Sequence, residues 1–228
     1  RLEKIGNLNS DGRPILGLDA KYLLEILLET TNNAMLVPAH IWTPWFSALG
    51  SKSGFDSIDE CFEDLTKYIY ALETGLSSDP AMNWLLSDLD KFNLISNSDA
   101  HSPDKLGREA NIFNCELSYS AMINSLKTTD NPDFVGTIEF FPQEGKYHLD
   151  GHRKCKVCWT PFDTLKNNGI CVVCNKPVTI GVLNRVAELC DRDDTASKKN
   201  KKKYFLIIPL IELLAEVYNK TVSSKFTQ

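Results

Sequence analysis

Four cysteines have the type and spacing of zinc ligands. They form two pairs, Cys155 with Cys158 and Cys171 with Cys174, and two residues separate the members of each pair. Each C-x2-C turn places two thiolates on one side of a metal, and a structural zinc takes four ligands in a tetrahedron. Free or redox-active thiols are the alternative, which two matched pairs disfavour. The spacing therefore predicts a closed, structural zinc site.

Histidine and carboxylate side chains form a second group, and each follows or ends a short apolar run. His40 lies in AMLVPAHI, Glu73 in IYALET, and Asp99 and His101 follow NLISN. Mixed nitrogen and oxygen ligands suit zinc, manganese or iron. Taken singly, each has a structural explanation: a packed core histidine, a loop-capping or Arg-paired carboxylate, or a helix N-cap. Their shared place at strand ends is what favours a metal site.

The elements that must position these side chains alternate between two types. Short apolar runs that indicate buried strands cover 34–41, 69–74, 93–97 and 134–141. Helical segments cover 18–30, 57–66, a stretch that begins with Asp79 as N-cap and Pro80 as first helical residue, and 118–126. This alternation indicates an α/β fold of parallel βα units, in which the chemistry lies at the C-terminal ends of the strands.

After Glu144 the alternation of strand-like and helix-like segments ends. The cysteine pairs follow, then a helical pattern over 180–189, and then an apolar segment over 204–218 that Pro209 would interrupt. We therefore divide the chain into a metal-hydrolase part over 1–144, a linker with the zinc ribbon over 145–180, and a helical segment over 181–228.

Candidate substrate-binding residues lie in two stretches. Lys146, His148, His152 and Arg153 occupy a polar linker that could hold a phosphate or a base edge, although a solvated linker would look the same. Trp42 lies in an aromatic loop after His40, where it could stack on a base or simply cover the site.

Composition narrows the class of protein. The 228 residues are 43% hydrophobic and 24% charged, with a net charge of −5, which is ordinary for a globular protein and lowers the expectation of non-specific DNA binding. No apolar stretch is long enough to span a membrane. Three scattered cysteines fit a reducing cytoplasm, so we expect a cytoplasmic protein without membrane contact.

Several long motifs resemble one known family. VPAHIWTPWFSALGSKSGFDSIDECF, ALETGLSSDPAMNW, NSDAHSP, EGKYHLDGHRKC and the paired cysteines before KPVTIGVLNRV are similar to endonuclease Q, from about Gly17 to Leu189. The resemblance implies a PHP (polymerase and histidinol phosphatase) domain, a distorted (β/α)7 barrel with two or three divalent metals (Zn, Mn, Mg or Fe). A zinc ribbon and a C-terminal helical part would follow. It implies cleavage of DNA on the 5′ side of deaminated bases such as hypoxanthine and uracil, with other repair or replication proteins as further candidate partners.

The resemblance also assigns residues. His40, Asp99 and His101 match metal ligands, with Asp99 and His101 at the catalytic centre; Glu73 matches a further ligand, and the four paired cysteines match the ribbon. The family's early H-x-H motif is absent from this sequence, which begins at Arg1 and has four histidines. We therefore expect an incomplete barrel that lacks the N-terminal part of the PHP domain. A non-catalytic nucleic-acid-binding fragment and a PHP-type small-molecule phosphoesterase are the alternatives.

Overall fold

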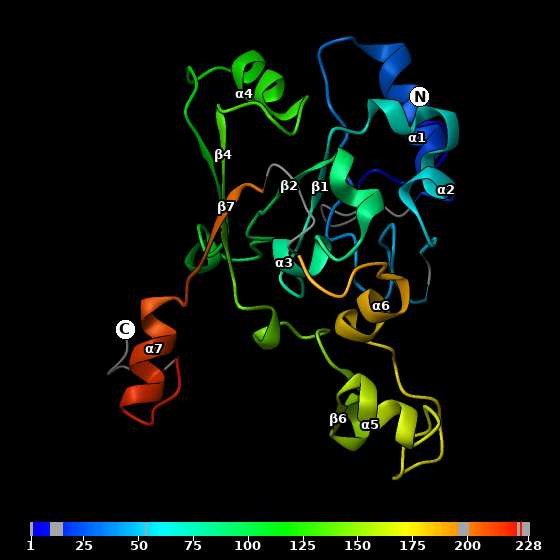
Figure 1. The fold of residues 1–228 in the computed structure, drawn as a ribbon, viewed down its shortest axis with the longest axis vertical. Helices are drawn as coiled ribbons and strands as arrows, with labels where there is room; N and C mark the ends of the chain where they lie inside the picture. Colours follow the sequence, from blue (N-terminus) through cyan, green and yellow to red (C-terminus); the bar gives the residue numbers. More distant parts are fainter. Residues whose placement is uncertain (1, 10–15, 53, 196–200, 223, 225–228) are drawn as a thin grey trace.

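The main body is a mixed α/β arrangement, and two smaller parts project from it (Figure 1). The computed structural model describes residues 2–9, 16–52, 54–195, 201–222 and 224. Its helices are α1 (Ala20–Thr30), α2 (Ile58–Phe62), α3 (Pro80–Asn83), α4 (Tyr119–Leu126), α5 (Pro161–Lys166), α6 (Val182–Leu189) and α7 (Leu210–Val217). Its strands are β1 (Ala71–Glu73), β2 (Asn93–Ile95), β3 (Ala110–Phe113), β4 (Phe134–Glu139), β5 (Asp150–His152), β6 (Val157–Trp159) and β7 (Lys203–Leu206).

Short 3-10 turns connect these elements. They are η1 (Leu2–Lys4), η2 (Glu63–Tyr68), η3 (Ser87–Lys91), η4 (Pro103–Lys105), η5 (Pro142–Glu144) and η6 (Arg153–Cys155).

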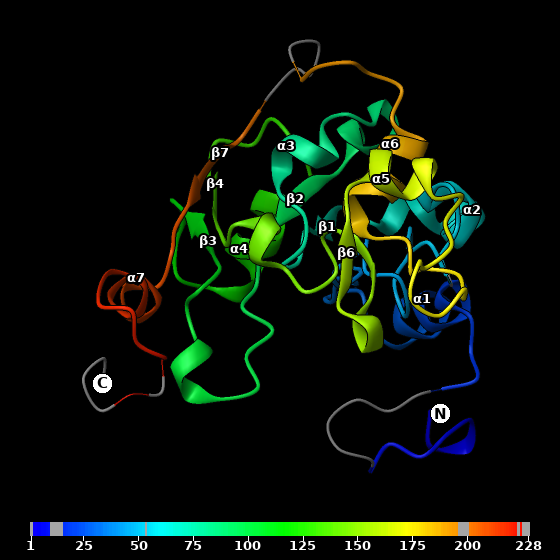
Figure 2. The ribbon, with the colours of Figure 1, turned by 90° about the horizontal axis from the view of Figure 1, so that it is seen from below.

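The strands of the described residues lie in three separate sheets. β1 pairs with β2 in parallel, and β5 forms an antiparallel hairpin with β6. In the third sheet β4 is central, antiparallel to β3 and parallel to β7, and the three strands run side by side in Figure 2. The chain is therefore an α/β protein, but the incomplete PHP-type barrel remains a prediction.

One core joins elements that are far apart in the sequence. Apolar side chains from α1, the loop after His40, α2, β1 and α6 pack together, among them Leu24, Trp42, Phe62, Leu72 and Val186. Each of these five is almost wholly excluded from solvent. The core therefore fixes α6, which follows the cysteine segment, against the body that carries His40.

Several expected elements are present with shifted ends. β1, β2, β4, α1, α4 and α6 fall within the segments that the sequence predicts. Asp79 caps α3 as expected, because its side chain accepts the Met82 N–H at 2.8 Å. Pro209 separates β7 from α7, so the apolar stretch over 204–218 is indeed interrupted.

The strand expected over 34–41 is wrong. This segment is extended but irregular, and it touches β1 through two hydrogen bonds, from Glu73 N–H to the Pro38 carbonyl and from Ile41 N–H to the Glu73 carbonyl. Pro38 has no N–H to donate, and the chain turns at His40, whose φ is 32°. A continuous ladder therefore cannot form. The expected parallel pairing is found between β1 and β2, whereas β4 also has an antiparallel neighbour, β3, which the sequence did not predict.

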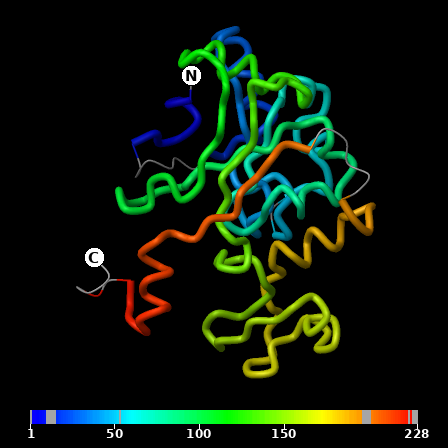
Figure 3. Tube along the Cα trace, turned by 60° about the vertical axis from the view of Figure 1, so that its left-hand side comes forward, coloured from blue at the N-terminus to red at the C-terminus, as the bar shows by residue number. Residues whose placement is uncertain are grey.

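The cysteine segment and α7 form the two projections. In Figure 3 the segment around β5, β6 and α5 lies below the main body, and α7 lies apart from both at the end of the strand β7. None of the described helices is long and apolar enough to cross a bilayer.

Candidate functional site

Two tight turns build the cysteine module. The first is the β5–β6 hairpin, where Lys156 adopts the left-handed conformation with φ 55°. The second runs from Cys171 to Lys176, closed by hydrogen bonds from Asn175 N–H to the Cys171 carbonyl and from Cys171 N–H to the Lys176 carbonyl. A bridge between Gly151 and Thr179 holds the two turns together. The module is thus organised by backbone pairing around its cysteines.

Four side chains converge between these turns. His152, Cys155, Cys171 and Cys174 bring their ligand atoms within 4.8 Å of one another, and the Cys174 sulfur lies 3.4 Å from His152 Nδ1. Burial, with the neighbouring Cys174 and Cys171, raises the pKa of the Cys155 thiol to about 11. Although burial opposes it, N–H donation by Val173 and Cys174 lowers the pKa of the Cys171 thiol to about 7. A metal bound here would require these thiols to lose their protons.

Cys158 lies outside this group. It is exposed on β6, whereas the cysteine pairs alone had suggested it as the fourth ligand. His152 takes that place, and the sequence carries a signal for it, because His152 precedes Cys155 by the same spacing that separates the cysteines of each pair. One histidine and three cysteines are a known structural zinc set, so the donor chemistry fits zinc.

The residues expected at the strand ends are partly brought together. Asp99 Oδ1 lies 3.6 Å from His101 Nε2, and both side chains are exposed. His40 is half-buried, and its Nδ1 lies 3.1 Å from Thr43 Oγ1. His40 and Asp99 both have positive φ, 32° and 43°, a strained region for residues other than glycine that concentrates at functional sites.

Glu73 is occupied by protein hydrogen bonds. It is buried, and its two carboxylate oxygens accept from the His40 backbone N–H at 2.7 Å and from Asn97 Nδ2 at 2.8 Å. The carboxylate therefore fixes the backbone of His40 and the loop that leads to Asp99. Gly75 packs against the same place, because a Cβ there would come within 2.7 Å of His40 Cβ.

Two further carboxyl groups, those of Glu109 and Glu139, are buried. Burial, followed by the charge of Glu139, raises the pKa of Glu109 to about 8, and burial raises the pKa of Glu139 to about 7. Glu139 accepts hydrogen bonds from Thr74 at 2.9 Å and from Thr137 at 2.5 Å. No motif in the sequence singled out either residue, because each looks like an ordinary strand carboxylate until its burial is known.

The five expected substrate-binding residues separate into three groups. Trp42 and His148 are buried: the Trp42 indole N–H donates to Asn83 at 2.8 Å, and His148 Nδ1 lies 3.1 Å from the Ser77 carbonyl. His152 belongs to the metal group. Lys146 and Arg153 are exposed, and both line a cavity of about 570 Å³ between the body and the cysteine module. Substrate contact by these residues remains a prediction.

Solved structures similar to this chain are endonucleases. The lesion-specific endonuclease Q from Pyrococcus furiosus superposes with a TM-score of 0.81 at 29% identity, over 99% of this chain and 55% of that one. Endonuclease Q in complex with a 27-mer duplex substrate, which has an abasic lesion at the active site, gives a TM-score of 0.85 at 29% identity, over 99% and 56%.

Two uncharacterized proteins are similar in sequence. One from Methanocaldococcus jannaschii is 33% identical over 194 residues, which cover 82% of this chain and 24% of that protein. The other, YqxK of Bacillus subtilis, is 32% identical over 178 residues, which cover 77% and 43%. No family model matches the chain. The chain thus spans less than half the length of these relatives and about half the length of the solved structures.

Proposed function

Because this chain belongs to the endonuclease Q family, we propose that it contributes to a metal-dependent DNA endonuclease that cleaves the phosphodiester 5′ of deaminated bases such as hypoxanthine and uracil. The observation that carries the proposal is the superposition of 99% of the chain on a lesion-specific endonuclease and on a complex with lesion-bearing duplex. Deaminated bases differ at the edge used for pairing, so an enzyme that reads them must take them out of the stack.

In this proposal Asp99 and His101 hold metal at the catalytic centre, and His40 is a further ligand. Divalent metals in such a site activate water and stabilise the oxygens of the reacting phosphate. Glu73 is the further ligand predicted from the family, and its hydrogen bonds hold the His40 backbone and Asn97 in place. A metal in the ribbon would have four protein ligands and no open position, so its role would be structural.

In this proposal, the described residues would supply only part of the catalytic metal site. Asp99 and His101 are neighbours, but the described residues bring three or more metal-ligating side chains together only in the cysteine module. A catalytic metal takes about three protein ligands. Additional ligands would therefore have to come from elsewhere in the longer proteins of this family.

That same observation favours a second candidate function. A chain that holds metal only in its ribbon would bind nucleic acid without cleaving it. Metal content separates the two: about one zinc per chain fits the binding fragment, and additional metal that Asp99→Ala removes fits the endonuclease. Additional metal with hydrolysis of small phosphate esters, and without DNA cleavage, would instead fit a small-molecule phosphoesterase.

The direct test is strand incision. A labelled duplex with one hypoxanthine is incubated with the chain and manganese, beside duplexes with uracil, with an abasic site and without a lesion. We expect a nick immediately 5′ of the lesion that Asp99→Ala abolishes. Asp104→Ala, which removes an exposed carboxylate a few residues away, should leave the nick intact.

Two results would contradict the proposal for this chain. Cleavage that Asp99→Ala leaves unchanged would mean that the activity does not arise at this site. Absence of cleavage together with tight binding of the same duplex would support the second candidate.

A further inference from the structure

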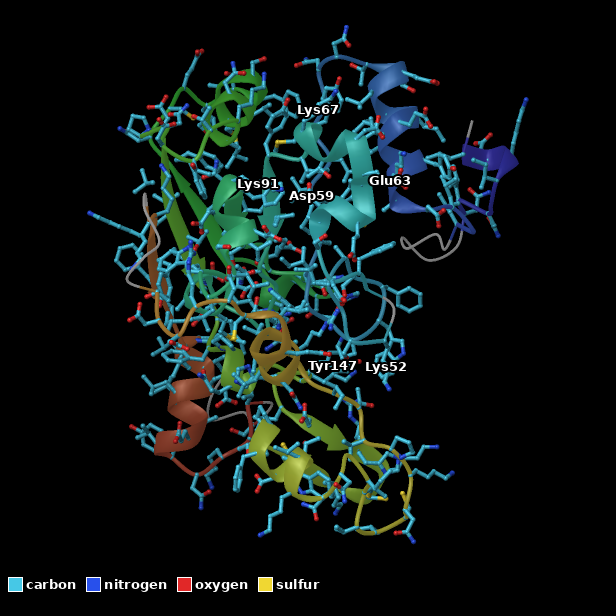
Figure 4. All side chains as sticks on the ribbon, turned by 45° about the vertical axis from the view of Figure 1, so that its right-hand side comes forward. Lys52, Asp59, Glu63, Lys67, Lys91 and Tyr147 are labelled. Atoms are coloured by element: carbon cyan, nitrogen blue, oxygen red, sulfur yellow. The ribbon has the colours of Figure 1, made fainter. Side chains whose placement is uncertain are left out.

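The cavity between the body and the cysteine module has walls from both. Trp45 comes from the body, Lys146 and Tyr147 come from the linker that leads into the module, and Arg153 and Lys156 come from the module. Tyr147 is labelled in Figure 4, on the lower part of the body where the cysteine module begins. The volume of about 570 Å³ is in the range of small-molecule sites. Asp99, His101, His40 and Glu73 do not line this cavity, so it is separate from the candidate catalytic residues.

The cavity is cationic. Lys146, Arg153 and Lys156 are exposed, and none of them forms an ion pair within the part of the chain that the structure describes. Asp150 also lines the cavity, but it is buried and engaged, since its oxygens accept from Gly181 N–H at 2.6 Å and Asn184 Nδ2 at 2.5 Å. The surface available to a ligand therefore attracts an anion.

The cavity also offers a flat apolar surface. Trp45 is 43% exposed, and its ring meets that of Tyr147 edge-on, with the centroids 6.2 Å apart at 71°. The ammonium of Lys146 lies 5.0 Å from the centre of the Tyr147 ring. Trp45 is therefore supported from one side, and its exposed part is available for stacking. A ring platform next to several cations suits a nucleotide, whose base stacks while its phosphate pairs with the charges.

The loop that carries Trp45 is tied to His40. Thr43 Oγ1 lies 3.1 Å from His40 Nδ1 and also 3.1 Å from the Trp45 carbonyl. The hydroxyl thus connects the stacking platform to a candidate metal ligand. A nucleotide held at Trp45 would therefore contact the loop that begins at His40.

We propose that this cavity binds one unpaired nucleotide of a DNA strand, with its base on Trp45 and its phosphate among Lys146, Arg153 and Lys156. The inference rests on the proposed function, because DNA is the polymer on which the chain acts. The site would hold the strand next to the lesion, without selecting a base, since stacking and phosphate contacts read no sequence. The cysteine module supplies two of the three cations, so a metal bound in the module would help to keep the site assembled.

The test measures binding without cleavage. Fluorescein-labelled ten-residue oligothymidylate is titrated with the zinc-loaded chain, without manganese or magnesium, and anisotropy gives the Kd. Trp45→Ala should weaken binding about tenfold, and Trp45→Phe, which keeps a ring, should recover most of the affinity. Phe162→Ala removes an aromatic ring that is 73% exposed on the module, and it should leave Kd unchanged.

The charge contribution has a matched control. Replacing Lys146, Arg153 and Lys156 together by Ala should reduce the slope of log Kd against log salt by about 0.7, because these cations share one phosphate and each phosphate contact on a single strand contributes about 0.7. Replacing Lys154, Lys166 and Lys176, three exposed lysines of the module that do not line the cavity, removes the same charge and should leave the slope unchanged. Zinc content and circular dichroism confirm that each variant is folded.

The outcomes separate this inference from the proposed function. Asp99→Ala should bind the oligonucleotide like the unaltered chain, so loss of incision with intact binding leaves the cavity proposal standing. If the Trp45 and cation variants bind like their controls, or if the unaltered chain does not bind, the cavity proposal is overturned, whatever the result of the incision test.

Discussion

His152 and Cys158 compete for one position in the ribbon. The structure places His152 with Cys155, Cys171 and Cys174 and leaves Cys158 exposed on its strand. We therefore expect about one zinc per chain in the unaltered protein and in Cys158→Ser, and little zinc in His152→Ala and Cys174→Ser. Metal analysis after gel filtration measures this. Zinc retained by His152→Ala and lost by Cys158→Ser would instead establish the set of four cysteines.

Gly75 is constrained by conformation and by its neighbour. Its φ is 68°, and a Cβ would meet His40 Cβ at 2.7 Å. Gly107 has a similar φ of 77° with nothing within 4 Å. Gly107→Ala should therefore lose about 1 kcal/mol of unfolding free energy from strain alone, and Gly75→Ala about 3 kcal/mol. Urea unfolding compares the two, and equal losses would mean that the His40 contact carries no cost.

At the scale of elements, α6 is fastened to the loop between His40 and α2. Arg185 is buried and donates to the carbonyls of Leu49 and Phe55, each at 3.1 Å, and to Asp56 at 2.5 Å. This guanidinium connects the helix after the cysteine module to the loop that carries Trp45. Arg185 therefore adds polar contacts to the apolar packing of α6 and links this helix to one wall of the cavity.

Truncation of Arg185 should loosen this junction. Arg185→Ala leaves two carbonyls without their donor, and we expect a loss of about 3 kcal/mol in unfolding free energy. Glu188→Ala removes only an exposed partner of the same arginine and should cost less than about 1 kcal/mol. Chemical denaturation checks both, and similar small losses would show that α6 is held by its apolar face alone.

The helices were more predictable than the strands, for local reasons. Ser118 caps α4 and Asp79 caps α3 through their own side chains, so the signals lie within a few residues of the element. β3 and β7 are fixed by partners far along the chain, and no local pattern marked either one. The site shows the same division: cysteine spacing located the ribbon, whereas the inclusion of His152 depended on how two turns meet.

At the scale of the whole molecule, buried carboxyl groups make stability depend on pH. The pKa of Glu109 is raised to about 8 and that of Glu139 to about 7, from an ordinary 4.5. Between pH 4.5 and 8 the folded chain binds more protons than the unfolded chain, so the unfolding free energy falls as pH rises through this window. We expect Tm to be roughly 5 °C lower at pH 8 than at pH 6.

Glu109→Gln should flatten this dependence, because an amide does not titrate. Glu116→Gln changes an exposed carboxylate a few residues further along the chain and should leave the dependence of Tm on pH unchanged. Thermal unfolding followed by circular dichroism at several pH values gives the comparison. A slope that Glu109→Gln does not alter would assign the dependence to other groups.

The parallel pairing of β4 with β7 has a consequence for folding. These neighbouring strands are separated in the sequence by the cysteine module, α6 and the segment that follows, so the sheet closes a long loop. Closing a loop costs entropy that grows with the logarithm of its length, by about 0.6 kcal/mol for each doubling. A metal that draws His152 and Cys174 together shortens the flexible path between the strands before they meet. Metal binding by the ribbon would thus close part of this loop in advance and speed the pairing of β4 with β7.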